Sequence, residues 1–296
     1  MHRPYRVMGI VNVTPDSFSD GGKFLDAGAA IAHARRLVRE GADILDVGGE
    51  STRPGAEPVP ADEELRRVAP VLEWLAAAGL DARVSIDTSK AVVAHAALDA
   101  GASIVNDVTA LRADPQMAGL IAERGAECCL MHMLGEPRTM QSPAGGGAGG
   151  QGGPHYDDVV DEVKAFLEAR LAFAVREGVR EERIMLDPGI GFGKGTEHNL
   201  ALLRRLHELV AIGRPLVIGT SRKSFIGRIV AADAGHPEPA GVRERLPGTI
   251  ATNVLALERG ASVFRVHDVA AVRGALAVAA ATLGGRWPAR AGTRTS

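Results

Sequence analysis

The chain has 296 residues, of which 46% are hydrophobic and 24% charged, and its formal net charge is −2. These proportions are ordinary for a soluble globular protein and exclude disorder as a description of the whole chain. The near-neutral charge argues against nucleic acid as a partner, because a protein that binds many phosphates needs an excess of lysine and arginine.

We expect neither membrane insertion nor export. No stretch of about 18 uninterrupted apolar residues occurs, so no membrane span is expected. Residues 1–6 lead into a strand-like segment without the apolar run of a signal peptide. The two cysteines, Cys128 and Cys129, are adjacent, which excludes a disulfide framework and is typical of a reducing compartment. The sequence therefore predicts a cytoplasmic protein that does not bind membranes.

Short apolar runs, each typical of a strand covered on both faces, alternate with longer helical segments along the chain. The candidate strands are residues 5–11, 44–47, 84–86, 104–105, 127–131, 184–186, 216–218 and 263–266. Apolar residues spaced i, i+3, i+4 and i+7 predict amphipathic helices between them, for example over 27–38 and 160–175. This alternation predicts the α/β class and a single-domain (β/α)8 barrel, with an open, doubly wound sheet as the alternative.

Three segments fall outside this alternation. Residues 144–153 hold seven glycines in ten positions, which predicts a flexible loop inserted between a strand and a helix of the barrel. Residues 233–247 are rich in proline, glycine and charge, and predict a loop or an irregular helix end. Residues 285–296 carry three arginines and no acid. We expect them to form a flexible basic tail, and we assign residues 1–284 to the barrel.

Polar residues and glycines follow the carboxyl end of almost every candidate strand. These segments are 12–22, 48–55, 87–90, 106–107, 131–133, 187–194, 219–224 and 265–268. In a (β/α)8 barrel these strand ends meet at one rim, where active sites lie. Loops at the opposite rim, such as 39–43, are short and plain. The sequence therefore predicts an enzyme or a small-molecule binder whose site draws residues from many strands.

Asp87, Asn106 and Asp187 are the first candidates for this site. An Asp or Asn after a strand often caps the next helix, which is the alternative for each of them alone. Asp87 and Asn106, however, end neighbouring strands at equivalent depth, which favours a shared polar site. Lys223 follows an apolar strand in a Ser-Arg-Lys-Ser run, and hydroxyl, guanidinium and ammonium groups packed together there predict a partner that is an anion or a carbonyl acceptor. A solvated charge is the alternative for Lys223.

The sequence offers few ligands to a metal ion. Neither Cys-x-x-Cys nor His-x-x-x-His occurs, which argues against a zinc site. A Mg²⁺ site remains compatible with the sequence. The ion would be held by one or two protein oxygen atoms, such as that of Asn12, and otherwise by a substrate phosphate. No Ser-His-Asp or Cys-His arrangement is evident. We interpret Cys128 and Cys129 as small buried side chains, with a reactive pair as the alternative.

Eight segments, in order and at plausible separations, resemble the dihydropteroate synthases. They are MGIVNVTPDSFSDGG at 8–22, DVGGESTRPGA at 46–56, SIDTSK at 85–90, IVNDVTAL at 104–111, LMHM at 130–133, DPGIGFGK at 187–194, GTSRKSFIG at 219–227 and RVHDV at 265–269. The combination of NVTPDSFSDGG with GESTRPGA is highly specific. The resemblance implies a (β/α)8 barrel, usually a homodimer. Such enzymes condense 6-hydroxymethyl-7,8-dihydropterin diphosphate with 4-aminobenzoate, giving 7,8-dihydropteroate and diphosphate in folate synthesis.

The resemblance also implies roles for individual residues. The catalytic residues would be Asp87, Lys223, Arg265 and His267. The pterin would bind Asp87, Asn106, Met131, Asp187, Lys223 and Arg265. The diphosphate would bind Asn12, Thr52, Arg53, Arg265 and His267, with Asn12 also holding Mg²⁺. 4-Aminobenzoate, and the sulfonamides that imitate it, would bind Phe18, Thr52, Pro54, Phe192 and Ser224.

No residue in this set resembles a nucleophile, and the mechanism that the resemblance implies needs none. Diphosphate would leave first, giving a pterin cation beside Asp87, and the amine would then attack. The loops at 14–22 and 49–55 would close over the diphosphate. One departure from the family pattern is Met-Leu-Gly-Glu-Pro at 133–137, where the family has Met-Gln-Gly-x-Pro. We expect this change and the glycine-rich insertion to affect the dynamics of this loop and the reaction rate.

Two alternatives share the barrel and its pterin residues. A pterin methyltransferase domain that acts with a corrinoid partner should lack the diphosphate loops, which are complete here. A non-catalytic pterin-binding paralogue should carry damage in those loops or in the Arg-x-His pair, and none is visible in the sequence. The synthase is therefore the favoured interpretation.

Overall fold

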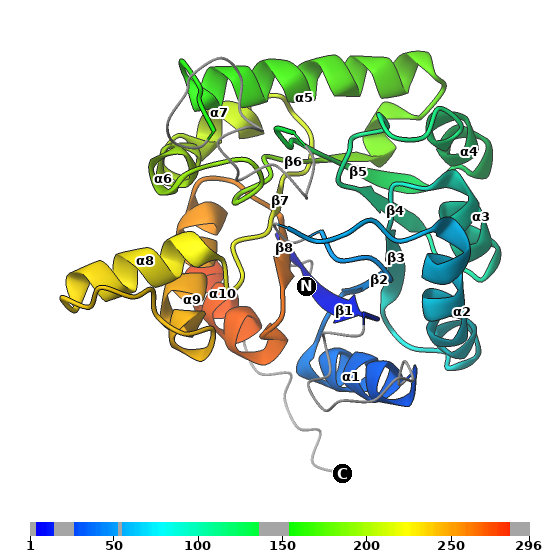
Figure 1. The fold of residues 1–296 in the computed structure, drawn as a ribbon, viewed down its shortest axis with the longest axis horizontal. Helices are drawn as coiled ribbons and strands as arrows, with labels where there is room; N and C mark the ends of the chain where they lie inside the picture. The colour runs from blue at the N-terminus through cyan, green and yellow to red at the C-terminus, as the bar shows by residue number, and fades with distance from the viewer. Residues whose placement is uncertain (1–3, 15–26, 53–54, 136–153, 285–296) are drawn as a thin grey trace, which may run out of the picture.

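The computed structural model describes residues 4–14, 27–52, 55–135 and 154–284. The predicted loop at 144–153 and the predicted tail at 285–296 lie outside these ranges. Strands and helices alternate along the described chain, and the helices surround the strands (Figure 1). The strands are β1 (Arg6–Asn12), β2 (Ile44–Gly48), β3 (Arg83–Asp87), β4 (Ile104–Asp107), β5 (Glu127–Met131), β6 (Ile184–Asp187), β7 (Val217–Ile218) and β8 (Val263–Val266). The α-helices are α1 (Ala27–Glu40), α2 (Ala61–Ala77), α3 (Ala91–Asp99), α4 (Met117–Arg124), α5 (Val159–Arg176), α6 (Thr196–Arg204), α7 (Leu206–Val210), α8 (Ser224–Asp233), α9 (Leu246–Glu258) and α10 (Val269–Gly284).

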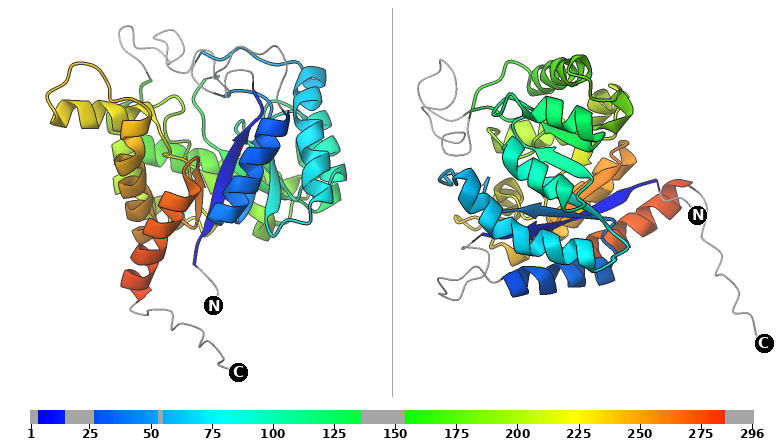
Figure 2. Two further views of the ribbon diagram at one scale, coloured as in Figure 1. Left: turned by 90° about the horizontal axis from the view of Figure 1, so that it is seen from below. Right: turned by 90° about the vertical axis from the view of Figure 1, so that its right-hand side faces the viewer.

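The eight strands form one parallel sheet that closes on itself. The order along the sheet is β6-β5-β4-β3-β2-β1-β8-β7, which leaves β6 and β7 at its two ends. A parallel bridge between Leu186 and Leu216 joins these ends, and the amide of Leu186 donates to the carbonyl oxygen of Pro215 at 3.0 Å. The fold is therefore a (β/α)8 barrel, as predicted, and the doubly wound alternative is wrong. Figure 2 shows the helices outside the strands from two further sides.

The strands form because both of their faces are buried in apolar surroundings. The outward faces pack on the helices, where residues such as Val7, Leu45 and Phe264 are fully buried. The inward faces of seven strands form a second apolar cluster, made by Met8, Ile44, Ile104, Cys129, Met185, Val217 and Val263. This cluster fills the barrel below the strand ends and gives the polar residues above it a water-free floor.

The strand register places the predicted polar residues at one level of the barrel. Asp87 pairs with Asn106, and Met131 pairs with Asp187, in neighbouring parallel strands. Gly48 pairs with Asp87, so β2 contributes the same level. Since carboxyl ends of parallel barrel strands share a rim, these side chains belong to one site, as the sequence predicted.

Two further predictions about the fold agree with the structure. Helices α1 and α5 occupy the two segments predicted as amphipathic helices. The irregular stretch predicted at 233–247 separates α8 from α9, and α9 begins with Pro247 in its first turn. Across the residues that the structure describes, no helix has the length and apolar character that crossing a bilayer requires.

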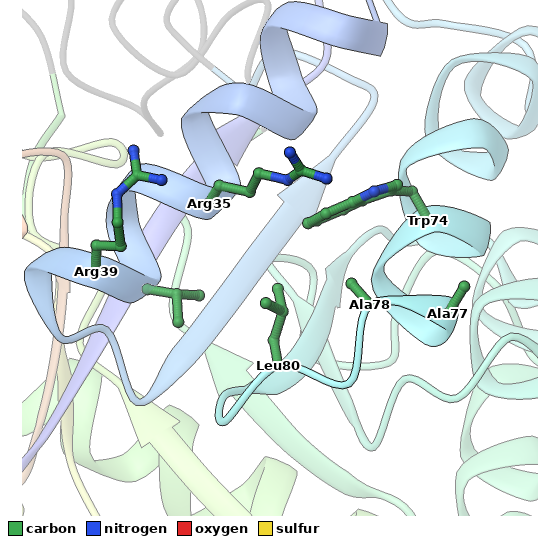
Figure 3. A pocket seen from close by; sticks show the side chains of 7 residues that line it. Arg35, Arg39, Trp74, Ala77, Ala78 and Leu80 are labelled. Atoms are coloured by element: carbon green, nitrogen blue, oxygen red, sulfur yellow. The ribbon is translucent and has the colours of Figure 1, made fainter.

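A surface hollow of about 360 Å³ lies on the helical layer, between α1 and α2 (Figure 3). Its lining includes Arg35, Arg39, Trp74 and Leu80, and the Arg35 guanidinium carbon lies 4.6 Å from the centre of the Trp74 ring. None of the polar residues that follow the strands contributes to it. The chemistry predicted from the sequence therefore lies elsewhere, at the rim of the barrel.

Candidate active site at the carboxyl rim of the barrel

Arg265 joins three strands at the centre of the site. From β8 its Nε donates to Oδ2 of Asp46 in β2, and its Nη2 donates to Oδ2 of Asp87 in β3, both at 2.6 Å. Both carboxylates are buried: Asp46 is 0% exposed and Asp87 7%. Short charge-assisted bonds of this kind are about twice as strong as neutral ones, so the guanidinium fixes both acids within the barrel.

Asp46 is a site residue that the sequence analysis missed. Its Oδ2 also accepts a hydrogen bond from Nδ2 of Asn106 at 3.0 Å, so it connects Arg265 to the predicted pterin residue in β4. Its Oδ1 has no partner among the described residues. The signal was present, because an acid in the middle of the apolar run Ile-Leu-Asp-Val is costly to bury without a function or a partner.

Burial and neighbouring charges shift the pKa values of Asp87 and Arg265. Burial raises the pKa of Asp87 to about 7, a rise that Arg265 opposes and Asp46 reinforces. Burial works against the charge of Arg265, but the carboxylates of Asp46 and Asp87 outweigh it and raise its pKa above the usual value. The guanidinium therefore stays charged, while Asp87 titrates near neutral pH.

Asp187 and Lys223 form the second charged group of the site. Asp187 ends β6, and its Oδ1 accepts a hydrogen bond from the amide of Gly189 at 2.7 Å. Lys223 precedes α8 and donates from Nζ to the carbonyl oxygen of Ile190. Burial raises the pKa of Asp187, against the attraction of Lys223, and burial lowers the pKa of Lys223 to about 7, against the attraction of Asp187. Each group therefore stabilises the charge of the other.

Phe192 supplies an aromatic surface beside Lys223. The Lys223 Nζ lies 4.3 Å from the centre of the Phe192 ring, within the range of a cation–π contact. The ring also packs against an apolar cluster made by Val108, Met131 and Met133. The site thus combines charged groups deep in the barrel with an apolar wall that a flat aromatic ligand could contact.

The structure separates the residues of the predicted Ser-Arg-Lys-Ser run. The Ser221 hydroxyl lies 2.9 Å from Nδ1 of His267 and also accepts the His267 amide at 3.1 Å. Arg222 has a left-handed backbone (φ 60°) and pairs with Asp268 at 2.6 and 2.9 Å. Of these three residues, Lys223 is the one that interacts electrostatically with Asp187. The sequence predicted that the Arg222 guanidinium packs with the Lys223 ammonium group, but in the structure it pairs with Asp268 instead.

Three of the remaining predicted site residues, Asn12, Thr52 and Ser224, lie in the described part of the chain. Asn12 ends β1 and is half-buried, as is Thr52 in the loop that follows β2. Ser224 is exposed at the first position of α8. Phe18, Arg53 and Pro54 lie outside the described residues.

Neither a protein-built metal cage nor a reactive thiol occurs in the described part of the chain. No group of three or more His, Cys, Asp or Glu side chains is arranged there to hold a metal ion. Cys128 and Cys129 are both fully buried. Burial raises the pKa of Cys128 to about 12 and that of Cys129 well above its usual value. Both thiols therefore stay protonated, which agrees with a structural role.

Another ionic group, formed by Lys90, Glu50 and Glu64, holds the loop after β2 and was also not predicted from the sequence. Lys90 follows β3 and pairs with Glu50 and with the fully buried Glu64, the latter at 2.5 Å. The other carboxylate oxygen of Glu50 accepts the amide of Val59 at 3.0 Å. These contacts tie both ends of the loop that carries Thr52 to the barrel.

Comparison with known proteins gives this arrangement a family. Residues 8–267 match the family model described as pterin binding enzyme. The chain is 47% identical over 282 residues to the dihydropteroate synthase of Mycobacterium leprae, covering 95% of this chain and 94% of that protein. A crystal structure of the Xanthomonas albilineans dihydropteroate synthase with 4-aminobenzoic acid superimposes with a TM-score of 0.83 at 46% identity, covering 94% of this chain and 93% of the other. The same enzyme in complex with 7,8-dihydropteroate gives a TM-score of 0.79 at 45% identity, covering 94% of each chain. The chain belongs to the dihydropteroate synthase family of pterin-binding enzymes.

Proposed function

We propose that the chain condenses 6-hydroxymethyl-7,8-dihydropterin diphosphate with 4-aminobenzoate, giving 7,8-dihydropteroate and diphosphate. The observation that carries this proposal is the buried network of Arg265 with Asp46, Asp87 and Asn106, which interacts electrostatically with Asp187 and Lys223. A reduced pterin has a guanidine-like edge of donors next to a carbonyl oxygen. Buried carboxylates and an ammonium group are the partners that such an edge requires.

Each polar group of the pterin has a partner of matching chemistry in this proposal. Asp187 and Asn106 bind the guanidine-like edge, and Asp87 accepts from a further ring nitrogen. Lys223 releases the carbonyl oxygen of Ile190 and donates to the ring carbonyl and a ring nitrogen. Met131 packs against the ring from the apolar side. Donor hydrogen bonds from the pterin favour the charged forms of Asp87 and Asp187 and so offset the effect of their burial.

The buried carboxylates of the site support departure of diphosphate before the amine attacks. Asp87 and Asp187 lie in the barrel beside the proposed pterin position. When they are ionised, their negative charge stabilises a cation delocalised over the reduced ring. Asp87 is the nearest acid in this scheme, and no residue acts as a nucleophile. His267 and Arg265, with Thr52 and Arg53, stabilise the leaving diphosphate.

Isotope scrambling distinguishes this order from direct displacement. The substrate carries a heavy oxygen isotope between its methylene carbon and phosphorus, and the enzyme acts on it without 4-aminobenzoate. If the carbon–oxygen bond breaks first and re-forms, the label moves to a non-bridging position of the same phosphorus, which phosphorus NMR resolves. Absence of scrambling in an enzyme that turns over with the amine would contradict the order.

Mg²⁺ fits this site as a partner of the substrate rather than of the protein. Asn12 ends β1 at the rim and offers one oxygen, and the described residues hold no cluster of acids or histidines that could complete a cage. Mg²⁺ typically takes one or two protein oxygens and binds substrate phosphates for the rest. Bound in that way, with Asn12 as its protein ligand, Mg²⁺ would neutralise charge on the diphosphate.

4-Aminobenzoate binds on the outer side of the pterin. Phe192 and the apolar cluster around Met131 offer its ring a flat contact. The other residues that we assign to this subsite are Phe18, Thr52, Pro54 and Ser224. The aromatic amine then points to the exocyclic carbon that diphosphate leaves.

The pKa shifts predict a narrow pH optimum. Asp87, raised to about 7, must be ionised, so activity rises with pH through its pKa; Lys223, lowered to about 7, must be protonated, so activity falls above its pKa. We expect kcat/KM for the dihydropterin diphosphate to be bell-shaped, with its maximum near neutrality. Lys223→Arg keeps its charge at high pH and is expected to lose the alkaline limb. An alkaline limb that is the same in this variant would contradict the role of Lys223.

We infer further that the active protein is a cytoplasmic homodimer. Two packed helices each expose a large apolar side chain, Leu255 on α9 (43%) and Val278 on α10 (63%), and burying these side chains would favour self-association. Val278→Asp is expected to shift the molar mass measured by light scattering from that of a dimer to that of a monomer. The control Val92→Asp changes a similarly exposed residue on α3 and should leave the mass unchanged. A monomeric parent protein would overturn the inference.

A further inference from the structure

Lys194 is a buried lysine that no step of the proposed mechanism uses. It ends the Gly-Ile-Gly-Phe-Gly-Lys segment after β6 and is 3% exposed. Its Nζ lies 3.0 Å from the carbonyl oxygens of both Gly189 and Phe192, and 2.8 Å from Nδ1 of His132. The side chain therefore folds back under its own loop and connects it to the loop that follows β5.

The loop that Lys194 holds carries two contacts of the proposed substrate site. Its residue Phe192 contacts the Lys223 ammonium group through its ring, and the carbonyl oxygen of Ile190 accepts the Lys223 hydrogen bond. The backbone can turn this tightly because glycine occupies its left-handed positions, with φ of 65° at Gly189. A Cβ at Gly189 would lie 1.8 Å from the carbonyl oxygen of His132. The two loops are thus in direct contact where Lys194 joins them.

Nζ of Lys194 and Nδ1 of His132 form one hydrogen bond, in which one nitrogen donates and the other accepts. Burial lowers the pKa of Lys194 well below its usual value, and burial together with the Lys194 charge lowers the pKa of His132 to about 2. The pair therefore holds at most one positive charge. His132 is fixed from its other side by the Phe166 ring, with 4.8 Å between ring centres. Because His132 itself cannot move freely, it is a firm anchor for the loop.

We propose that Lys194 is a positioning residue for the second substrate: it ties the Gly189–Phe192 backbone to His132 and so holds the Phe192 ring where the aromatic amine must bind. This inference rests on the proposed function, in which Phe192 contacts 4-aminobenzoate. Small displacements of a binding group lower the rate of a bimolecular reaction strongly, because the reacting atoms must be held in contact. Loss of Lys194 should therefore affect 4-aminobenzoate more than the pterin, because Asp87, Asp187 and Arg265 lie on strands whereas Phe192 lies on the loop itself.

Lys194→Met tests this, since methionine has a similar length and no hydrogen-bond donor. We expect KM for 4-aminobenzoate to rise about tenfold or more, and KM for the dihydropterin diphosphate to change by less than about threefold. The matched control is Tyr156→Phe, which removes a buried hydrogen bond of 2.9 Å to the carbonyl oxygen of Gly193 in the same loop. It should lower the midpoint of thermal unfolding without raising KM for 4-aminobenzoate.

The outcomes separate the positioning role from a merely structural one. Equal rises in both KM values, an unchanged KM for 4-aminobenzoate, or the same rise in Tyr156→Phe would overturn the inference. If Lys194→Met does not fold, Lys194→Gln, whose amide can still donate to one carbonyl, decides by the same criterion. A parent protein that makes no dihydropteroate would overturn the proposed function instead, so the two failures are distinguishable.

Discussion

Lys223→Ala is expected to lower kcat/KM by about 10³-fold, which corresponds to ~4 kcal/mol of transition-state stabilisation, while the barrel stays folded. The variant loses the cation that balances Asp187 and that donates to the pterin carbonyl in the proposed complex. Steady-state kinetics with both substrates, together with circular dichroism, measures the two halves of this prediction. Asp187→Ala should behave in the same way, because it removes the other member of the pair.

The control for this prediction is Arg228→Ala, which removes an exposed cation from the same helix α8. It should leave kcat/KM within about twofold of the parent value, as exposed charges of this kind contribute little. A near-normal rate in Lys223→Ala would refute the site assignment. An equal loss in the control would show that the effect belongs to α8 as a whole.

Arg265→Met is expected to abolish measurable turnover and to destabilise the fold by about 3–5 kcal/mol. The two carboxylates that Arg265 holds at 2.6 Å, Asp46 and Asp87, would remain buried without a cation. The loss of stability should be larger at about pH 8 than at about pH 5. Carboxylates without their partner take up protons more readily, so at the lower pH the variant no longer buries their charge. Urea unfolding at the two pH values measures this difference.

A double variant separates the charge effect from the loss of packing. Adding Asp46→Asn to Arg265→Met removes one of the uncompensated charges, so we expect it to recover about 1 kcal/mol or more of the lost stability without recovering turnover. A double variant no more stable than Arg265→Met, or an Arg265→Met protein as stable as the parent, would contradict the account of the cluster.

The strand ends could be predicted from the sequence because barrel strands are short apolar runs and their carboxyl ends share a rim. That rule placed Asp87 beside Asn106, and the register confirms the pairing. It could not indicate how far a side chain reaches. Arg265 lies in β8, and His267 directly follows that strand. Their side chains nevertheless find different partners, since the guanidinium binds Asp46 and Asp87 whereas the imidazole lies beside the Ser221 hydroxyl.

Two of the residues missed from the sequence are charged groups inside an apolar and a glycine-rich segment. Asp46 lies within a run that predicts a buried strand, and Lys194 ends the glycine-rich segment 187–194. Both are buried because their partners come from distant strands and loops, Arg265 for Asp46 and His132 for Lys194. Periodicity and local spacing carry no information about such partners.

The central claim is tested most directly by mixing the purified protein with 6-hydroxymethyl-7,8-dihydropterin diphosphate, Mg²⁺ and 4-aminobenzoate, and following dihydropteroate and diphosphate together. We predict equimolar formation of both products, dependent on the amine and on Mg²⁺. Binding of the pterin without formation of dihydropteroate would contradict the account, and would instead identify a pterin-binding protein that has lost the reaction.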